Sequence, residues 1–250
     1  MELTKLEQKL LELFNDGDIT TITNLYKLNK FLGITENNVI KGAMSRMVKK
    51  GIMIRLSRGK YLVTKSLATF DPLKLANYIF DGYIALSSAL FIYGYNSTKS
   101  FSIWGITTFR KKTRKIDEYT YISLPMGTLV FGVIEYKGYK VSTRAKTLFD
   151  CIYNIHYLDD LGPVIALVRD MKKEDFNELL VYLKLAKNSS LIQRIGFFLE
   201  KAGAPKSVLT SLDSIKGRSV TRLDKKNGKC INYNSRWKVF DNINLNRFIQ

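Results

Sequence analysis

The chain has 250 residues and a formal net charge of +18, from 40 Lys and Arg against 22 Asp and Glu. Its hydrophobic fraction of 46%, with 14 Tyr and 14 Phe, is enough to build packed cores and argues against wholesale disorder. So large a basic excess favours a polyanionic partner, most commonly nucleic acid. Two other origins of the charge stay open at this point: solubility or genome composition, and binding to an anionic membrane.

The cysteines and the N-terminal segment narrow the cellular context. Cys151 and Cys230 are the only cysteines, and two isolated thiols make neither a disulfide framework nor a metal knuckle. The N-terminal segment carries acids among its apolar residues, which is unlike a signal peptide, and no apolar run reaches about 18 residues. We therefore expect a cytoplasmic protein with reduced thiols and no membrane-spanning helix.

The first seventy residues predict three helices. Apolar residues within 3–14 have helical spacing, and the polar run 15–18 ends that helix. A second helix is expected at about 21–31, with Gly33 as its breaker. A third is expected at about 35–50, beginning at a threonine that can cap it. This succession of helices and a short turn is the order of a helix-turn-helix.

A hairpin is predicted directly after the third helix. Gly51 stands where a C-terminal glycine belongs, and residues 52–56 and 61–64 are strand-like around the turn at 57–60. A hairpin in this position is a wing. Residues 1–68 are therefore predicted to form a winged helix-turn-helix DNA-binding domain.

Charge is distributed unevenly over this domain. Residues 37–70 hold eight basic residues and no acid, whereas the first helix carries three glutamates. We expect the third helix and the wing to face DNA, with simple solvation of the lysines as the alternative. The apolar face predicted for the third helix consists of Val39, Ile40, Ala43, Met44, Met47 and Val48. The residues predicted to bind base edges or phosphates are Asn37, Asn38, Lys41, Ser45, Arg46, Lys49, Arg55, Arg58 and Lys60.

Residues 69–250 are predicted to form a second, larger domain of mixed helices and strands, which makes the whole chain α+β. A linker is expected at 66–71. Predicted helices lie at 72–80, 83–93, 144–157, 161–170, 175–187, 190–202 and 205–212. Predicted strands lie at 101–108, 119–124, 129–136, 139–141, 219–223, 229–233 and 236–240.

Two basic segments of this larger domain are candidates for a second contact with DNA. Five of the six residues 110–115, interpreted as a loop, are basic, and 216–238 hold eight basic residues and one acid. Solvation and phosphate contact are equally compatible with these runs. The secondary candidates are Arg110, Lys111, Lys112, Arg114, Lys115, Arg218, Arg222, Lys225 and Lys226.

The sequence carries no familiar catalytic motif. It has no HExxH, GxSxG, Walker or GxGxxG pattern, its acids are scattered, and its one histidine, His156, is expected to be structural. We therefore expect no enzyme, no cofactor and no metal. Two alternatives stay open: a nuclease-like enzyme whose acids converge on a metal in the fold and whose winged helix serves for docking, and a protein-interaction adaptor.

Five blocks of sequence occur in a recognisable order. They are GIMIRLSRGKYL at 51–62, YIALSSALFIYG at 83–94, VSTRAKTLFD at 141–150, RIGFFLE at 194–200 and NSRWKV at 234–239, followed by Asn242. In this order the blocks resemble the AbiEi-type antitoxins, a family described as predicted transcriptional regulators of viral defence systems. Tyr93 stands where histidine is common in that family, and Lys146 interrupts its Ala-Arg-Thr block. We expect Gly94, Leu148 and Trp237 to specify the core of the fold and not an active site.

The resemblance implies two activities. One is autorepression, in which the winged helix binds double-stranded DNA at an inverted repeat upstream of its own operon, as a monomer or homodimer on paired half-sites. The other is neutralisation, by the larger domain, of a nucleotidyltransferase-like toxin, without the need for a stable complex. In some members of the family both domains contribute positive surface to DNA.

Overall fold

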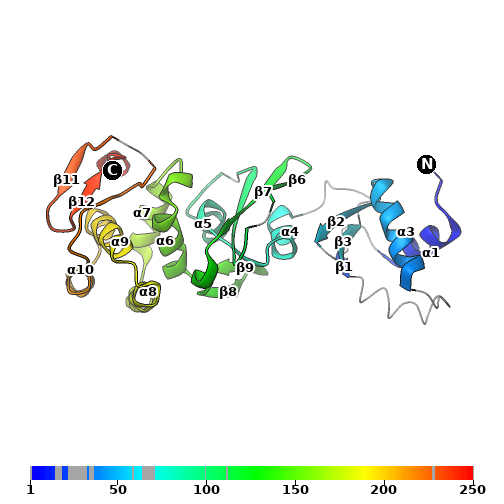
Figure 1. Cartoon of the computed structure of the whole chain (residues 1–250), viewed down its shortest axis with the longest axis horizontal. Helices are drawn as coiled ribbons and strands as arrows, with labels where there is room; N and C mark the ends of the chain where they lie inside the picture. Colours follow the sequence, from blue (N-terminus) through cyan, green and yellow to red (C-terminus); the bar gives the residue numbers. More distant parts are fainter. Residues whose placement is uncertain are drawn as a thin grey trace. The chain divides into compact units, whose positions relative to one another are not determined.

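The computed structural model of the chain describes residues 2–14, 19–21, 33, 37–57, 59–63, 71–98, 100–110, 112–226 and 229–249. The chain is α+β, as predicted, with three separate sheets among the described residues (Figure 1). It divides into two compact units, Met1–Ile79 and Phe80–Gln250. The domain boundary predicted at 68/69 falls within residues 64–70, outside the described part of the chain.

Two helices and a three-stranded sheet form the main body of the first unit. Its elements are α1 Lys5–Glu12, β1 Ile19–Thr21, α3 Asn37–Lys49, β2 Met53–Ser57, β3 Lys60–Val63 and α4 Pro72–Ile79. The sheet is antiparallel with the order β1-β3-β2, and α3 packs against both α1 and β2. The third helix and the hairpin therefore lie where the sequence predicted them.

Strand β1 is a difference from the sequence prediction. Thr21 was expected to begin the second helix, but it belongs to β1, where it is paired with Lys60 of β3. Three extended residues have no local periodicity, and β1 is stabilised by hydrogen bonds to a strand about forty positions later. The rest of the predicted second helix, 22–31, and the predicted capping residue Thr35 lie outside the described residues.

Helix α3 buries one stripe and ends at a glycine. The core of this unit consists of Leu10, Phe14, Ile40, Ala43, Met44, Met47, Met53, Tyr61 and Val63. Val39 was placed on the buried face, and this is wrong, because it lies at the edge of the stripe and is 42% exposed. Gly51 has a φ of +74°, which lets its N–H and that of Ile52 bond the carbonyls of Val48 and Met47. The chain thus turns directly from α3 into β2.

The second unit is built on a six-stranded mixed sheet. Its strands are β4 Gly82–Ile84, β5 Ser102–Thr107, β6 Arg114–Ile116, β7 Tyr119–Pro125, β8 Val133–Tyr136 and β9 Tyr139–Ser142. The order is β6-β7-β5-β4-β9-β8; β5 and β7 run parallel, as do β4 and β9, and the other neighbours are antiparallel.

Helices separate this sheet from a small C-terminal sheet (Figure 1). The helices described in the second unit are α5 Leu86–Tyr93, η2 Gly127–Leu129, α6 Arg144–Tyr153, η3 Ile155–Tyr157, α7 Gly162–Asp170, α8 Lys173–Ala186, α9 Ser189–Ala202, α10 Lys206–Asp213 and η4 Leu245–Phe248. The C-terminal strands are β10 Thr221–Arg222, β11 Asn232–Asn234 and β12 Val239–Asp241, in the order β10-β12-β11.

Several local predictions in this unit are wrong. Residues 236–238, expected in a strand, form the turn between β11 and β12. Tyr83 and Ile84 lie in β4, between β5 and β9, and not in the helix that begins at Leu86. Arg114 and Lys115, interpreted as loop, lie in the edge strand β6, where charged side chains are common. Leu129 ends a 3-10 helix instead of beginning a strand. A short apolar or basic run does not by itself show whether a segment is a strand, a helix or a loop, because strand formation depends on pairing with a neighbouring strand.

The core positions expected from the family resemblance differ in their surroundings. Leu148 and Trp237 are both completely buried, as predicted. Gly94 is exposed, so its assignment to the core is wrong, but with a φ of +87° it ends α5, which confirms the stop expected after the predicted helix 83–93. Its role is set by backbone conformation and not by packing.

Lys146, at the position where the sequence departs from the family pattern, forms a buried ion pair. Its ammonium contacts the carboxylate of Asp150 one helical turn later, and Tyr83 donates a hydrogen bond of 3.0 Å to the other carboxylate oxygen. The Lys146 nitrogen also lies 4.3 Å from the ring centre of Phe149. Burial lowers the pKa of Lys146 and raises that of Asp150. Lys146, Asp150 and Tyr83 are all buried, where α6 packs in the core of the second unit.

Candidate nucleic-acid interface

Four of the predicted DNA-contacting residues share one exposed stripe of α3. Asn38, Lys41, Ser45 and Lys49 are all exposed. They are spaced by three, four and four positions, which at 3.6 residues per turn places them on the same side of the helix, opposite Ile40 and its buried neighbours. The stripe therefore offers amide, hydroxyl and ammonium groups along the length of α3.

Arg46 lies at the edge of this stripe and has a partner within the protein. Its Nε donates a hydrogen bond of 2.9 Å to Glu7 of α1, and its side chain remains 50% exposed. Lys50 binds the other oxygen of the same carboxylate at 2.6 Å. Two of the eight basic residues in 37–70 are thus paired with an acid of the first helix.

Glu7 has a structural role that the sequence analysis did not assign. Hydrogen bonds from Lys50, from the backbone of Thr4 and from Arg46 lower its pKa from 4.5 to about 2. Glu7 also accepts the backbone N–H of Thr4 while the Thr4 hydroxyl accepts that of Glu7, which is a capping box. The Thr-x-x-Glu spacing was the available signal for this role.

The hairpin contributes a smaller part of the candidate surface. Arg55 of β2 is exposed and stands opposite Tyr61, and Lys60 of β3 is half-buried opposite Ser57. The pairing shifts by a bulge between these two positions. Arg58 and the side chain of Asn37 lie outside the described part of the structure.

In the second unit, the basic segment after β5 borders a cleft of about 700 Å³. Arg110 and Lys112 line one side and are exposed, residues 122–125 of β7 line another, and Tyr157 of η3 completes it. Arg114 is half-buried and Lys115 exposed in β6, while Lys111 lies outside the described residues.

One residue of the C-terminal basic segment reaches the same tyrosine. The ammonium of Lys226 lies 4.8 Å from the ring centre of Tyr157. Arg222 and Lys225 are exposed near it in the chain, and Arg218 is exposed before β10. The two basic segments, more than a hundred residues apart, are therefore brought together at Tyr157 through Arg110, Lys112 and Lys226.

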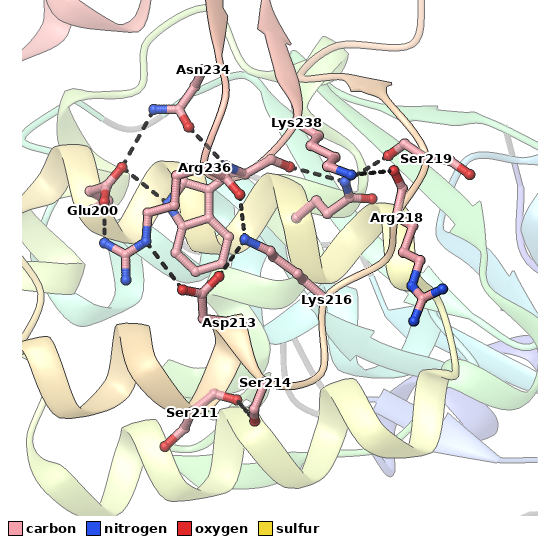
Figure 2. A network of polar contacts seen from close by, with 12 residues as sticks. Glu200, Ser211, Asp213, Ser214, Lys216, Arg218, Ser219, Asn234, Arg236 and Lys238 are labelled. Atoms are coloured by element: carbon pink, nitrogen blue, oxygen red, sulfur yellow. Dashed lines mark hydrogen bonds and ion pairs between the residues drawn. The ribbon is translucent and has the colours of Figure 1, made fainter.

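Other cations of the C-terminal segment hold the structure together (Figure 2). Arg236 binds Glu200 of α9 at 2.5 Å and Asp213 of α10 at 3.5 Å, and Lys216 also pairs with Asp213. Lys238 donates a hydrogen bond of 2.9 Å to the Arg218 carbonyl, while the Arg218 guanidinium points away from the network. Lys216, Arg236 and Lys238 thus anchor the segment, so its charge is only partly available to a ligand.

The remaining candidate groups are structural in their surroundings. The His156 ring lies 4.0 Å from that of Tyr157, and burial lowers its pKa. Cys151 is buried and Cys230 exposed, and both are free thiols.

Within the described ranges, no three His, Cys, Asp or Glu side chains gather as a metal site would require. None of the helices in the described part of the chain has the length and hydrophobicity of a bilayer crossing.

Comparison with known proteins shows the fold and nothing narrower. No protein-family model matches the chain, and no curated protein sequence matches it. Its fold is similar to that of the crystal structure of the RV2827C protein from Mycobacterium tuberculosis, with a TM-score of 0.59 and 12% sequence identity. The likeness covers 95% of this chain and 92% of that chain, so it includes both units.

Proposed function

We propose that this protein is a DNA-binding transcriptional regulator whose first unit is a winged helix-turn-helix. The observation that carries the proposal is the exposed stripe of α3, with Asn38, Lys41, Ser45 and Lys49 on one side of the helix. A hairpin that carries Arg55 and Lys60 follows this helix after a turn of three residues, 50–52. A recognition helix followed by a wing has this order.

The chemistry of the stripe fits a major groove. Asparagine and serine side chains both donate and accept hydrogen bonds, which suits base edges, and lysines suit phosphates. Asn38 and Lys41 occupy the N-terminal half of α3, the part of a recognition helix that reaches base edges. Lys49, at the other end, and Arg55 and Lys60 of the hairpin would contact the phosphate backbone.

The resemblance to AbiEi-type antitoxins supplies the biological form of the proposal. The protein acts in the cytoplasm, as a binding protein and not an enzyme, and represses its own operon through an inverted repeat. A two-fold repeat is occupied by a homodimer or by two monomers on paired half-sites. Sedimentation of the protein with and without the repeat distinguishes these two forms.

The same resemblance supports a second role for residues 80–250, the neutralisation of a nucleotidyltransferase-like toxin. Co-expression tests this role: the chain should restore growth to cells that produce such a protein from a neighbouring gene. Restoration by a variant that has lost DNA binding would separate neutralisation from repression. Failure of the full chain to restore growth would contradict the antitoxin role.

Binding of a labelled duplex from the protein's own upstream region, measured by fluorescence anisotropy, tests the DNA-binding proposal. The variant Lys41→Ala/Lys49→Ala should bind at least about tenfold more weakly, because it loses two phosphate-binding cations. The matched control is Lys5→Ala/Lys9→Ala, which removes the same charge from exposed positions of α1. Equal binding by both variants would contradict the proposal. Metal-dependent cleavage of the duplex would favour a nuclease, and salt-insensitive behaviour without DNA binding would favour an adaptor.

A further inference from the structure

The cleft beside Tyr157 has a positively charged lining, and all its described lining residues belong to the second unit, whereas the α3 stripe belongs to the first. Arg110 and Lys112 border it, and none of its described lining residues is acidic. Lys226 adds a third cation above the Tyr157 ring. Asp224, two residues before Lys226, is buried and accepts the backbone N–H of Lys226 at 2.9 Å, while the exposed Asp159 and Asp160 line a separate pocket that also borders Tyr157. The open face of the cleft therefore favours an anion.

Aromatic and apolar groups share this cleft with the cations. Ile122 and Leu124 of β7 lie along it, and Tyr157 forms a wall supported by Trp104, whose ring centre is 5.1 Å away. Phe109, directly before Arg110, is 78% exposed. The Thr107 hydroxyl donates a hydrogen bond of 2.8 Å to the Phe109 carbonyl and so holds the turn that presents this ring.

Exposed rings next to cations are the features that bind single-stranded nucleic acid. Unpaired bases stack on aromatic side chains while basic side chains follow the phosphates. A duplex keeps its bases stacked inside, so it would use the cations but not the rings. A free nucleotide would be mostly enclosed by its site, whereas Arg110, Lys112 and Phe109 are all exposed.

We propose that this cleft binds a segment of single-stranded nucleic acid. Arg110, Lys112 and Lys226 hold its phosphates, and a base stacks against Tyr157 once the Lys226 ammonium moves from the ring to a phosphate. This site is separate from the α3 stripe and does not depend on duplex binding there.

Fluorescence anisotropy of the full chain with labelled oligo(dT) of about 12 nucleotides tests the proposal. Arg110→Ala/Lys112→Ala and Tyr157→Leu should each weaken binding roughly tenfold or more, from lost phosphate contacts and lost stacking. Tyr157→Phe, which keeps the ring, should stay within about twofold of the parent. The matched charge control is Lys173→Ala/Lys184→Ala on exposed positions of α8, and it should also retain binding.

Several results would overturn the proposal. They are unchanged binding by Arg110→Ala/Lys112→Ala, an equal loss in the α8 control, and competition by AMP at the same concentration as oligo(dT). Arg110 and Lys112 are both exposed, so Arg110→Ala/Lys112→Ala should still fold and can test the proposal if Tyr157→Leu does not fold. The variant Lys41→Ala/Lys49→Ala should lose binding to the duplex but keep binding to oligo(dT). If it also lost binding to oligo(dT), the single strand would bind at α3, and the cleft proposal would be overturned. If no duplex binds at all, the regulator proposal fails while the oligo(dT) comparisons still decide this one.

Discussion

The indole ring of Trp237 lies directly against Gly196 of α9. A Cβ atom at Gly196 would stand 2.2 Å from Cζ3 of the ring, far inside any van der Waals contact. The Trp237 Nε1 donates a hydrogen bond of 3.0 Å to Glu200, one turn further along the same helix. The ring is therefore held at both of these positions, and the C-terminal sheet is fixed to α9 through it. Two of the blocks that resemble the antitoxin family meet in this contact.

Gly196→Ala should destabilise the second unit. The added methyl group collides with a completely buried ring that a hydrogen bond prevents from moving, and overpacking of this kind costs about 1–3 kcal/mol. Urea denaturation followed by tryptophan fluorescence measures the effect, because both tryptophans, Trp104 and Trp237, belong to this unit.

Gly42→Ala is the matched control for that substitution. It too changes a glycine inside a helix, but a Cβ at Gly42 meets only the flexible end of Arg46, at 3.4 Å. Alanine should therefore be neutral there or stabilise α3 by up to about 1 kcal/mol. Calorimetry of both variants shows whether each substitution raises or lowers the stability of its unit. A Gly196→Ala variant more stable than the parent would contradict the contact between Gly196 and Trp237.

Glu7→Gln should lower the thermal stability of the first unit at neutral pH, by roughly 4–8 °C, because Lys50 and Arg46 lose their carboxylate. A carboxyl whose pKa falls from 4.5 to about 2 on folding stabilises the folded state above pH 4.5. That contribution is lost as the pH falls toward 2. The gap in Tm between parent and variant should therefore close over this range.

Circular dichroism melting curves at a series of pH values measure that gap. Glu12→Gln, at an exposed position of the same helix, is the control and should show little effect at any pH. A gap that stayed constant down to pH 2 would show that Glu7 acts by packing and not by charge.

Lys146→Met should destabilise the second unit by about 3–5 kcal/mol, because it leaves the Asp150 carboxylate buried without a cation. The double variant Lys146→Met/Asp150→Asn should recover part of this loss, since the amide carries no charge and still accepts the Tyr83 hydroxyl. Urea denaturation of four proteins, the parent, Lys146→Met, Asp150→Asn and the double variant, gives the coupling energy. Additive losses would mean that the two side chains do not interact as described.

Lys41→Ala and Arg46→Ala should separate DNA binding from stability. Lys41 is exposed, so its loss should leave the Tm unchanged and reduce the slope of log affinity against log salt by about 1. Arg46 binds Glu7 within the protein, so its loss should lower the Tm as well. Anisotropy titrations over a range of salt, with melting curves of the same samples, check both expectations. A fall in Tm for Lys41→Ala alone would reverse this assignment.

Much of the secondary structure follows from local pattern. The apolar spacing of α3, the glycine at its end and the two strands of the hairpin are short-range features, and each was placed within a few residues. The long helices α7, α8 and α9 were located for the same reason. Periodicity reports which side of an element is apolar, and that side is usually buried.

The pairing of charges was beyond the reach of that pattern. The sequence shows Arg46, Lys50, Arg236 and Lys238 as members of basic runs, but Glu7, Glu200 and a backbone carbonyl bind them from distant segments. Sequence alone also left 110–115 and 216–238 as two unrelated basic stretches. Only the packing of η3 against both places Arg110, Lys112 and Lys226 around Tyr157.

The amino-acid order by itself therefore determined the α+β class, the positions of most helices and the stripe of polar residues on α3. The tertiary structure decided which cations have partners, which stand exposed, and where two remote segments meet at one tyrosine. The physical reason is that helical and strand periodicity acts over a few residues, whereas ion pairs and clefts depend on side chains that approach only when the chain is folded.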